Sequence, residues 1–458
     1  MGIAMVAAAI IIGKSFVYFG LFLAFSIIMT LVWKKIPRPW ISLVSVSAAT
    51  PIAIAKQQFS CNLIFALWFT IFNMKYLSKL PRWIYVLTSM ALCGIAISSV
   101  SWMGTDIVKG IMRQGAYALN FVLGPFIFLP IIYCRMEKSK DVTANLWGLL
   151  YCLIVPTTLI LLAAKLFGSV SNSYEASLHF GSQSEGYLQY KLVKVLVSFQ
   201  RTEIGFVLAA LICAAFAITV SKVRTKYRLL AGACLVANIY FLLVTVSFGS
   251  IVACICGLSA ILFAQLRIVN VGKLFMSIAA GVCLLILTYS FSPQSVKGYM
   301  EKRIEFRAKQ GERQDRFIMW GRGVDYILEH PEGIGFTLSL PDGSVVHNDY
   351  LAYTVSYSFM GGLAYISLVA GLLISFFKMR KRMSIDPCAF ATYLAGFGVI
   401  VAATVNSMTD HMTANRWYFN LIWSVIWYSY FCSRAAQAGS VKVEMRNKTV
   451  FAEKSPCH

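Results

Sequence analysis

The sequence has few charged residues, and few of those are acidic. Of its 458 residues 13% are charged, whereas an ordinary soluble domain has about 25%. Hydrophobic residues make up 58% of the chain, and the mean hydropathy is +0.70. This composition excludes a water-soluble enzyme, a disordered chain and a nucleic-acid-binding module. We therefore expect an integral membrane protein that contacts membrane lipids and has no nucleic-acid partner.

Several short motifs of well-known enzyme classes are missing. The sequence has no Asp-x-Asp pair, no HExxH, no GxSxG and no GxxxxGK[ST]. These absences argue against an enzyme for metal-bound nucleotide sugars, a zinc peptidase, a lipase and an ATPase, respectively. The spacing of the twelve cysteines predicts neither a disulfide framework nor a zinc site. We expect no metal site and no cofactor.

Long apolar runs occupy most of the chain. A helix needs roughly 20 apolar residues to cross a bilayer, and about a dozen runs approach or reach this length. Two shorter runs, 2–12 and 40–55, predict half-helices or further spans and bring the total to between 12 and 14. The pattern predicts an all-α polytopic membrane protein.

Basic residues cluster in alternate short loops between these runs. The loops 135–140, 221–228 and 378–382 carry 3, 4 and 4 Lys or Arg residues. Because such loops are retained on the cytoplasmic side, the alternate connections are predicted to lie on the opposite side, which in a bacterium is the periplasm. Those connections include 165–202 and 291–350.

The segment 291–350 differs from the rest of the chain. It holds 9 of the 19 acidic residues and 8 of the 41 basic ones, and it is too long for an ordinary turn. Its first half predicts one or two amphipathic helices, and its second half, rich in Pro and Gly, predicts a loop. We expect the functional site here. The predicted organisation is an N-terminal transmembrane bundle, a large periplasmic catalytic loop, C-terminal transmembrane helices and a cytoplasmic tail, at 1–290, 291–350, 351–433 and 434–458.

Basic residues on the predicted periplasmic side are candidate ligands for an anion. Arg201 lies at the outer boundary of a predicted span, and the large loop carries eight candidates: Lys297, Lys302, Arg303, Arg307, Lys309, Arg313, Arg316 and Arg322. Retained basic residues on this side need a reason, and the planar guanidinium group forms paired hydrogen bonds with phosphate. Two alternatives remain open: the loop arginines form surface ion pairs with neighbouring acidic residues, and Arg201 is a snorkelling anchor.

His347 lies immediately before a long predicted span. A histidine has an unperturbed pKa of about 6.5 and can accept a proton at neutral pH. Asn348 or Asp349 is placed to orient it or a substrate hydroxyl. In the alternative interpretation Asn348 or Asp349 caps the helix that follows. His411 is a weaker candidate for the base.

A series of short motifs occupies the loop and the start of the following span. It consists of Arg316-x-x-x-Trp320, HPEGIGF at 330–336, His347-Asn348-x-x-Leu351 and Gly361-Gly362. In order, spacing and position the series resembles the C-terminal region of the O-antigen ligase and O-antigen polymerase superfamily. The glycine pair predicts close helix packing. One departure is SFGS at 247–250, where many members carry Ser-Arg-Gly.

The resemblance implies a membrane glycosyltransferase of the GT-C type in the bacterial inner membrane, with its active site facing the periplasm. The implied donor is a glycan on undecaprenyl pyrophosphate, and the implied reaction is metal-independent and inverting. On this hypothesis Arg201, Arg303 and Arg316 bind the pyrophosphate. His347 acts as the base or positions the acceptor, and Asn348 supports it.

Three functions stay open at this point. An O-antigen ligase transfers the glycan to a lipid A-core sugar, whereas a polymerase transfers it to another lipid-linked glycan. Few basic residues remain for the second pyrophosphate site that a polymerase requires, which favours the ligase. A glycan-lipid flippase or transporter is the third, but charged residues inside the predicted spans are too few to support it.

Overall fold

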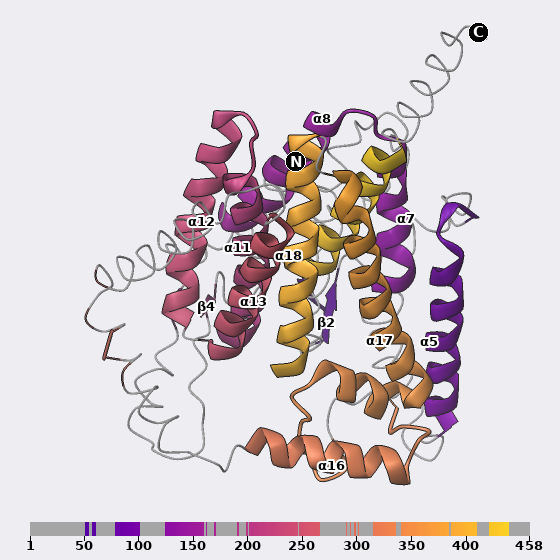
Figure 1. Ribbon diagram of the computed structural model, residues 1–458. Coiled ribbons are helices and arrows are strands. Elements are labelled where there is room, and N and C mark those ends of the chain that lie inside the picture. The colour runs from indigo at the N-terminus through magenta and orange to yellow at the C-terminus, as the bar shows by residue number, and fades with distance from the viewer. Residues whose placement is uncertain are drawn as a thin grey trace, which may run out of the picture.

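The protein is a bundle of long helices with a shorter helix across one end. The computed structural model describes, apart from short strands and a few isolated positions, residues 78–100, 124–159, 201–245, 247–265, 315–335, 340–383, 386–409 and 421–438. Figure 1 shows the long helices standing side by side, with α16 (Asp315–Glu329) lying across their lower ends.

Most of the long helices follow single apolar runs of the sequence. They are α5 (Arg82–Val100), α11 (Arg201–Val220), α12 (Thr225–Thr245), α13 (Phe248–Gln265), α17 (Asp349–Met383) and α18 (Pro387–Thr409). A further apolar helical stretch, Val142–Leu159, begins as α8 (Val142–Leu149) and passes through the π-helical turn η6 (Leu150–Ile154). Ahead of it lie α7 (Leu129–Tyr133) and the 3-10 helix η5 (Cys134–Lys138). Residues 421–438 are also helical.

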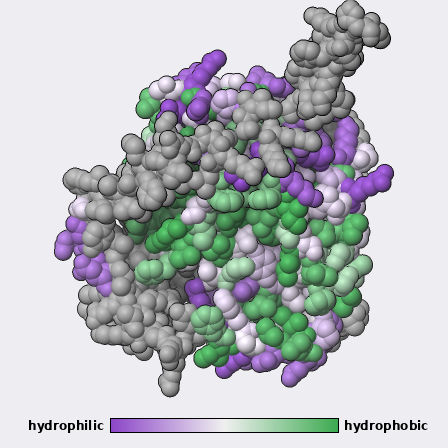
Figure 2. Space-filling view, viewed as in Figure 1, coloured by the Kyte–Doolittle hydropathy of each residue, from purple (hydrophilic) through white to green (hydrophobic). Residues whose placement is uncertain are grey.

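Six of the described helical stretches are long and apolar enough to cross a membrane, and the apolar part of α11, Ile204–Val220, is shorter. Figure 2 shows apolar side chains across the middle of the described surface and hydrophilic ones toward its upper and lower ends. The prediction of a polytopic helical membrane protein is confirmed. Among the apolar runs that predict spans, 15–33 and nearly all of 60–77 and 274–291 lie outside the described residues.

A few short strands accompany the predicted helices. Strand β1 (Pro51–Ile54) pairs antiparallel with β2 (Gln57–Ser60) across a two-residue connection. A second small sheet has the order β3 (Ser169–Val170), β4 (Tyr190–Lys191), β5 (Ser198–Phe199), also antiparallel. The run 40–55 predicts a helix, but Pro51 has no amide hydrogen for a helix interior, and residues 51–54 form the hairpin strand instead.

Glycines let the helices of the bundle approach at backbone distance. A Cβ atom added to Gly94 of α5 would lie 2.6 Å from the backbone nitrogen of Gly361 in α17. A Cβ atom on Gly257 of α13 would lie 2.7 Å from the carbonyl oxygen of Gly398 in α18. Because helices in a bilayer associate by close packing of small residues, these contacts hold α5 to α17 and α13 to α18. The close packing predicted at Gly361 is therefore present.

Helix α18 runs from one end of the bundle to the other. Near its start, the Thr143 hydroxyl contacts the Cys388 sulfur, and Arg434 pairs with Glu137 at 2.9 Å. At its other end, Arg316 of α16 donates a hydrogen bond to the carbonyl oxygen of Thr409. Figure 1 places the junction of α11 with α12 and the end of α17 at the first of these ends. The basic loops thus lie opposite α16.

The charge pattern predicts which end faces the cytoplasm. A periplasm-active reporter enzyme fused after residue 340 is expected to be active, and one fused after residue 224 inactive, because basic loops are retained in the cytoplasm. Reporter activity in whole cells, normalised to fusion abundance, measures this. The reverse pattern would place α16 in the cytoplasm and contradict the site assignment.

Candidate functional site

Residues 315–335 and 340–359 form a compact unit at one end of the bundle, with a small hydrophobic core of its own. The buried side chains of Leu340, Val346 and Val355 form its centre. The side chains packed around this centre belong to Trp320, Tyr326, Ile327, Ile334 and Leu351. Gly323 lets α16 approach, because a Cβ atom there would lie 3.0 Å from a Val346 methyl group. The unit contains α16, one helix within the region predicted to form one or two amphipathic helices, and the described residues of the loop motifs; most of residues 291–314 lie outside the described residues.

Trp320 fixes the backbone at His347. Its indole Nε1 donates a hydrogen bond to the His347 carbonyl oxygen at 3.3 Å. His347 is half-buried and has a φ of 37°, in the left-handed region that few non-glycine residues adopt. Arg316 and Trp320 lie four residues apart and so share one face of α16. The Arg-x-x-x-Trp motif therefore holds the main chain of the candidate base.

Asn348 is the N-cap of α17. Its Oδ1 accepts hydrogen bonds from the backbone amides of Tyr350 at 3.0 Å and Leu351 at 3.2 Å. Its Nδ2 donates to the carbonyl oxygen of Met408 at 3.4 Å. A capping side chain satisfies amides that have no partner within the helix. The structure thus shows the capping role that the sequence analysis left open, and it also ties the start of α17 to the end of α18.

The Asp349 carboxylate makes a second link between these two helices. The side chain is fully buried, and its Oδ2 accepts a hydrogen bond from the Ser407 hydroxyl at 3.0 Å. The Ser407 hydroxyl also lies 3.4 Å from the Tyr365 hydroxyl. Burying a carboxylate is costly unless hydrogen bonds compensate. This contact therefore restrains Asp349 and, with it, the neighbouring residues of the loop.

Arg316 makes the third link, to the last residue of α18. Its guanidinium is half-buried and donates from Nη1 to the Thr409 carbonyl oxygen. The final carbonyls of a helix have no intrahelical partner and carry partial negative charge, so a guanidinium stabilises them. Asp349, Asn348 and Arg316 thus contact three consecutive residues, Ser407, Met408 and Thr409.

The SFGS segment at the start of α13 also lies beside the last residue of α18. A Cβ atom on Gly249 would lie 2.6 Å from the Thr409 hydroxyl oxygen. The hydroxyls of Ser247 and Ser250 lie 2.9 Å apart. Phe248, whose side chain is 39% exposed, stands where many members of the superfamily carry the arginine of Ser-Arg-Gly.

Arg201 starts the helix that packs on this segment. It is the first residue of α11 and lies four residues before Gly205, hence one turn away along the same helical face. A Cβ atom on Gly205 would lie 2.5 Å from the Ser250 hydroxyl oxygen. The backbone of Arg201 therefore lies at the same end of the bundle as Arg316. Arg303 and His411 lie outside the described residues.

The turn of the HPEGIGF motif fits into a kink of α17. The helix is interrupted at Tyr357 and Ser358, and Ser358 has φ 65° and ψ 171°. The amide of Ile334 donates to the Val355 carbonyl at 2.7 Å, and the amide of Phe359 donates to the Pro331 carbonyl at 3.1 Å. A kink leaves backbone groups without helical partners, and the turn supplies those partners.

Ser358 adopts a backbone conformation that is nearly exclusive to glycine, at a cost of about 1–3 kcal/mol. We expect Ser358→Gly to raise the unfolding temperature, with a net gain of about 1 kcal/mol after the entropic cost of glycine. The control Ser356→Gly lies in the helical part of α17 and should lower it. Thermal unfolding of both variants in detergent tests this, and destabilisation by Ser358→Gly would contradict it.

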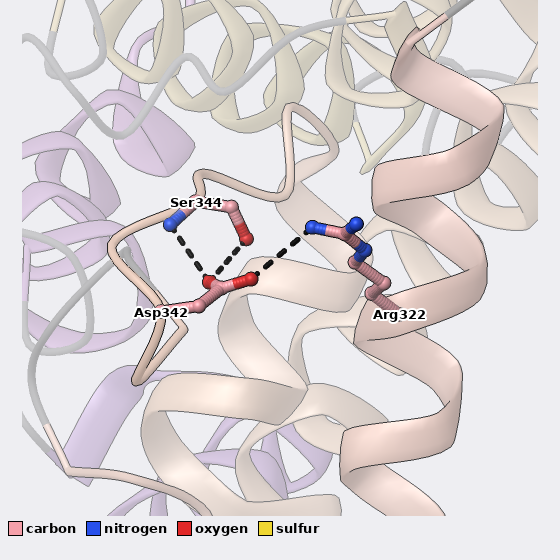
Figure 3. A network of polar contacts seen from close by, with 3 residues as sticks. All are labelled: Arg322, Asp342 and Ser344. Carbon is pink, nitrogen blue, oxygen red and sulfur yellow. Dashed lines mark hydrogen bonds and ion pairs between the residues drawn. The ribbon is translucent and has the colours of Figure 1, made fainter.

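An exposed ion pair joins α16 to the turn before His347. The Arg322 Nη1 atom lies 3.2 Å from Asp342 Oδ2, and the amide and hydroxyl of Ser344 donate to Oδ1 at 2.9 and 2.6 Å. Figure 3 shows how these three side chains face one another. The bonds from Ser344, with the nearby Arg322 charge, lower the pKa of the Asp342 carboxyl below its usual range. Arg322 thus forms a surface ion pair, the alternative considered for the loop arginines, whereas Arg316 contacts the end of α18.

The site is therefore built from the sequence motifs and the end of α18. Most of its residues lie in a segment that matches a known protein family. Residues 233–366 match the O-antigen ligase family. This confirms the resemblance to the O-antigen ligase and polymerase superfamily. The O-antigen ligase match includes Gly249, Arg316, Gly333 and His347. The end of α18 and Arg201 lie beyond the matched O-antigen ligase segment.

Comparison with solved structures gives a chain from work titled "Structural coordination of polymerization and crosslinking by a peptidoglycan synthase complex". The TM-score is 0.40 with 15% sequence identity, over 77% of this chain and 98% of that one. No curated protein matches the sequence.

The end of α18 was not predicted as part of the site. Arg316 and Asn348 contact the backbone carbonyls of Thr409 and Met408, and no residue type marks a carbonyl that will accept such a bond. The available signal was the polar Ser407 at the end of an otherwise apolar run, together with the carboxylate of Asp349.

Proposed function

We propose that the protein is an O-antigen ligase-type glycosyltransferase at the periplasmic face of the bacterial inner membrane. It transfers a glycan from undecaprenyl pyrophosphate to a lipid A-core sugar, without a metal ion and with inversion at the anomeric carbon. The match over 233–366 supports a ligase or polymerase of this superfamily. The donor, the acceptor and the orientation are part of the proposal.

The observation that carries the proposal is the arrangement of Arg316 and His347. Trp320, one turn after Arg316 on α16, bonds to the His347 carbonyl, while Arg316 itself bonds to the end of α18. A cationic group for a leaving pyrophosphate and a candidate base are thus held by one short helix. Both lie at one end of the apolar bundle, and on this proposal that end is where the pyrophosphate of a lipid-linked sugar would meet water.

The chemistry follows from these two groups. The acceptor hydroxyl oxygen attacks the anomeric carbon while His347 takes its proton. The bond between that carbon and the pyrophosphate oxygen breaks, and the electron pair leaves with the pyrophosphate. A guanidinium carries five N–H donors in a fixed plane, and we assign Arg316 to the developing charge on the leaving group. Arg201 and Arg303 are proposed to complete the anion site.

Arg316 and Arg322 form a matched pair that tests the anion site. We expect Arg316→Lys to lower the transfer rate more than tenfold, because lysine keeps the charge but loses the planar donor geometry and the loss of a charge-assisted contact costs about 1.5–3 kcal/mol. Arg322→Lys, on the same helix, should leave the rate unchanged. Transfer from a purified lipid-linked glycan is the measurement, and equal effects of the two substitutions would contradict the assignment.

Deletion of the gene distinguishes ligase from polymerase. A strain without the ligase should make lipopolysaccharide that lacks O-antigen and should accumulate long lipid-linked glycan. Core capped by a single repeat unit would identify the polymerase instead. In the purified system, EDTA should leave transfer unchanged; loss of activity that Mg²⁺ or Mn²⁺ restores would overturn the metal-independent mechanism.

A further inference from the structure

Helix α16 has an apolar face that none of the described residues covers. Phe317, Val324 and Leu328 are 61%, 43% and 76% exposed. Their spacing of seven and four residues places them along one side of the helix. They lie about a quarter turn away from the side that carries Arg316, Trp320 and Ile327 and packs on the protein. The exposed residues Asp325 and Glu329 lie on the side directed away from that packed face.

Helix α17 carries a second exposed apolar row, along its outer side. The row consists of Phe359, Leu363, Ile366, Ile374 and Phe377, which are between 38% and 58% exposed. Intervals of four, three, eight and three residues keep them on one face. The row lies within Asp349–Arg380, one of the candidate membrane spans. This face is therefore the part of α17 that contacts lipid.

A short connection links the end of α16 to the exposed row of α17. Leu328 lies in the last turn of α16, three residues before Pro331, and the Pro331 carbonyl accepts the hydrogen bond from the Phe359 amide. Phe359 is the first member of the lipid-facing row. The end of the α16 row is thus joined by a short, hydrogen-bonded connection to the membrane-facing surface of the bundle.

We propose that α16 lies in the membrane interface and that its Phe317, Val324 and Leu328 side chains insert into the acyl-chain boundary of the bilayer. An amphipathic helix lying parallel to a membrane, with charged residues directed to water, binds in this way. A second copy of the chain is the weaker occupant, because three side chains provide far less than the about 800 Å² that each partner buries in a specific interface. The interfacial helix would fix the height of His347 and Arg316 above the hydrocarbon.

The test uses the full chain in vesicles of phosphatidylethanolamine and phosphatidylglycerol. A genetically encoded fluorescent amino acid is placed at position 328 and, in a matched protein, at position 325 on the water-facing side. We expect lipids with a spin label near the start of the acyl chain to quench the fluorophore at 328 about twofold more than that at 325. Iodide in the buffer should show the opposite preference.

Position 317 provides an independent repeat, should a fluorophore at 328 disturb folding. Equal quenching at 328 and 325 by the spin-labelled lipid would overturn the proposal. Protection of position 328 from both quenchers would also overturn it and would indicate a protein partner, such as a second copy of the chain. Because the readout is fluorescence, its outcome is independent of whether the chain transfers glycans.

Discussion

Replacing His347 with asparagine is expected to lower glycan transfer by about 10²–10⁴-fold, the usual contribution of a general base. Asparagine adopts the left-handed backbone conformation readily, so the bond from Trp320 to the carbonyl of residue 347 should persist. Its amide side chain cannot take up a proton near neutral pH. The transfer rate per folded protein, together with the unfolding temperature, measures the effect.

Asn348→Ala is the matched control for this experiment. It removes the cap of α17, which typically costs about 1 kcal/mol, so we expect a lower unfolding temperature with a smaller change in rate. Near-normal transfer by the His347→Asn variant would contradict the assignment of His347 as the base and leave it only a structural role in the backbone before α17. Loss of activity in His411→Ala but not in His347→Asn would move the base to the segment after α18.

Gly333→Ala should destabilise the protein by about 2–5 kcal/mol, the sum of a left-handed backbone penalty and overpacking. Gly333 has a φ of 80°, and a Cβ atom there would lie 2.7 Å from the Ser358 amide nitrogen and 2.9 Å from the Val355 carbonyl oxygen. Backbone atoms cannot move aside as a flexible side chain can. The turn would have to leave the kink of α17, and the bonds at Ile334 and Phe359 would be lost with it.

Gly343 makes this prediction specific. It has the same φ of 80°, but a Cβ atom there would meet nothing within 4 Å. Gly343→Ala therefore carries only the left-handed penalty of about 1–2 kcal/mol. Thermal unfolding of the two variants side by side isolates the contact with α17. Equal destabilisation would mean that the seating of the turn in the kink contributes nothing.

The helices of the bundle were predictable because each apolar run of this length has one stable form in a bilayer. Apolar runs of the sequence predicted α5, α13 and α18. The observed helix boundaries differ from the predicted ones by a few residues where a polar cap, such as Asn348, sets the first turn. The β1–β2 hairpin was missed because apolar composition does not distinguish a strand from a short helix, and Pro51 was the only local signal.

The motif residues were predicted, whereas their contacts were not. Sequence spacing placed Arg316 and Trp320 on one helix face, but it gave no means of knowing that α18, about 90 residues later in the chain, ends beside them. The kink at Ser358 was also hidden, because serine is not a residue that marks a left-handed position. Arg303 keeps its predicted role as a proposal.

The contacts at the end of α18 determine which positions of this sequence can vary among homologues. Two of the three links, from Asn348 and Arg316, are made to main-chain oxygens, which every amino acid provides. The Met408 side chain is 48% exposed, so position 408 is free to vary among homologues while its place in the structure is kept. Ser407 bonds through its side-chain hydroxyl, so position 407 is not free to vary. An alignment would therefore show a variable position at the point where the site is anchored, and a search guided by invariance would pass over it.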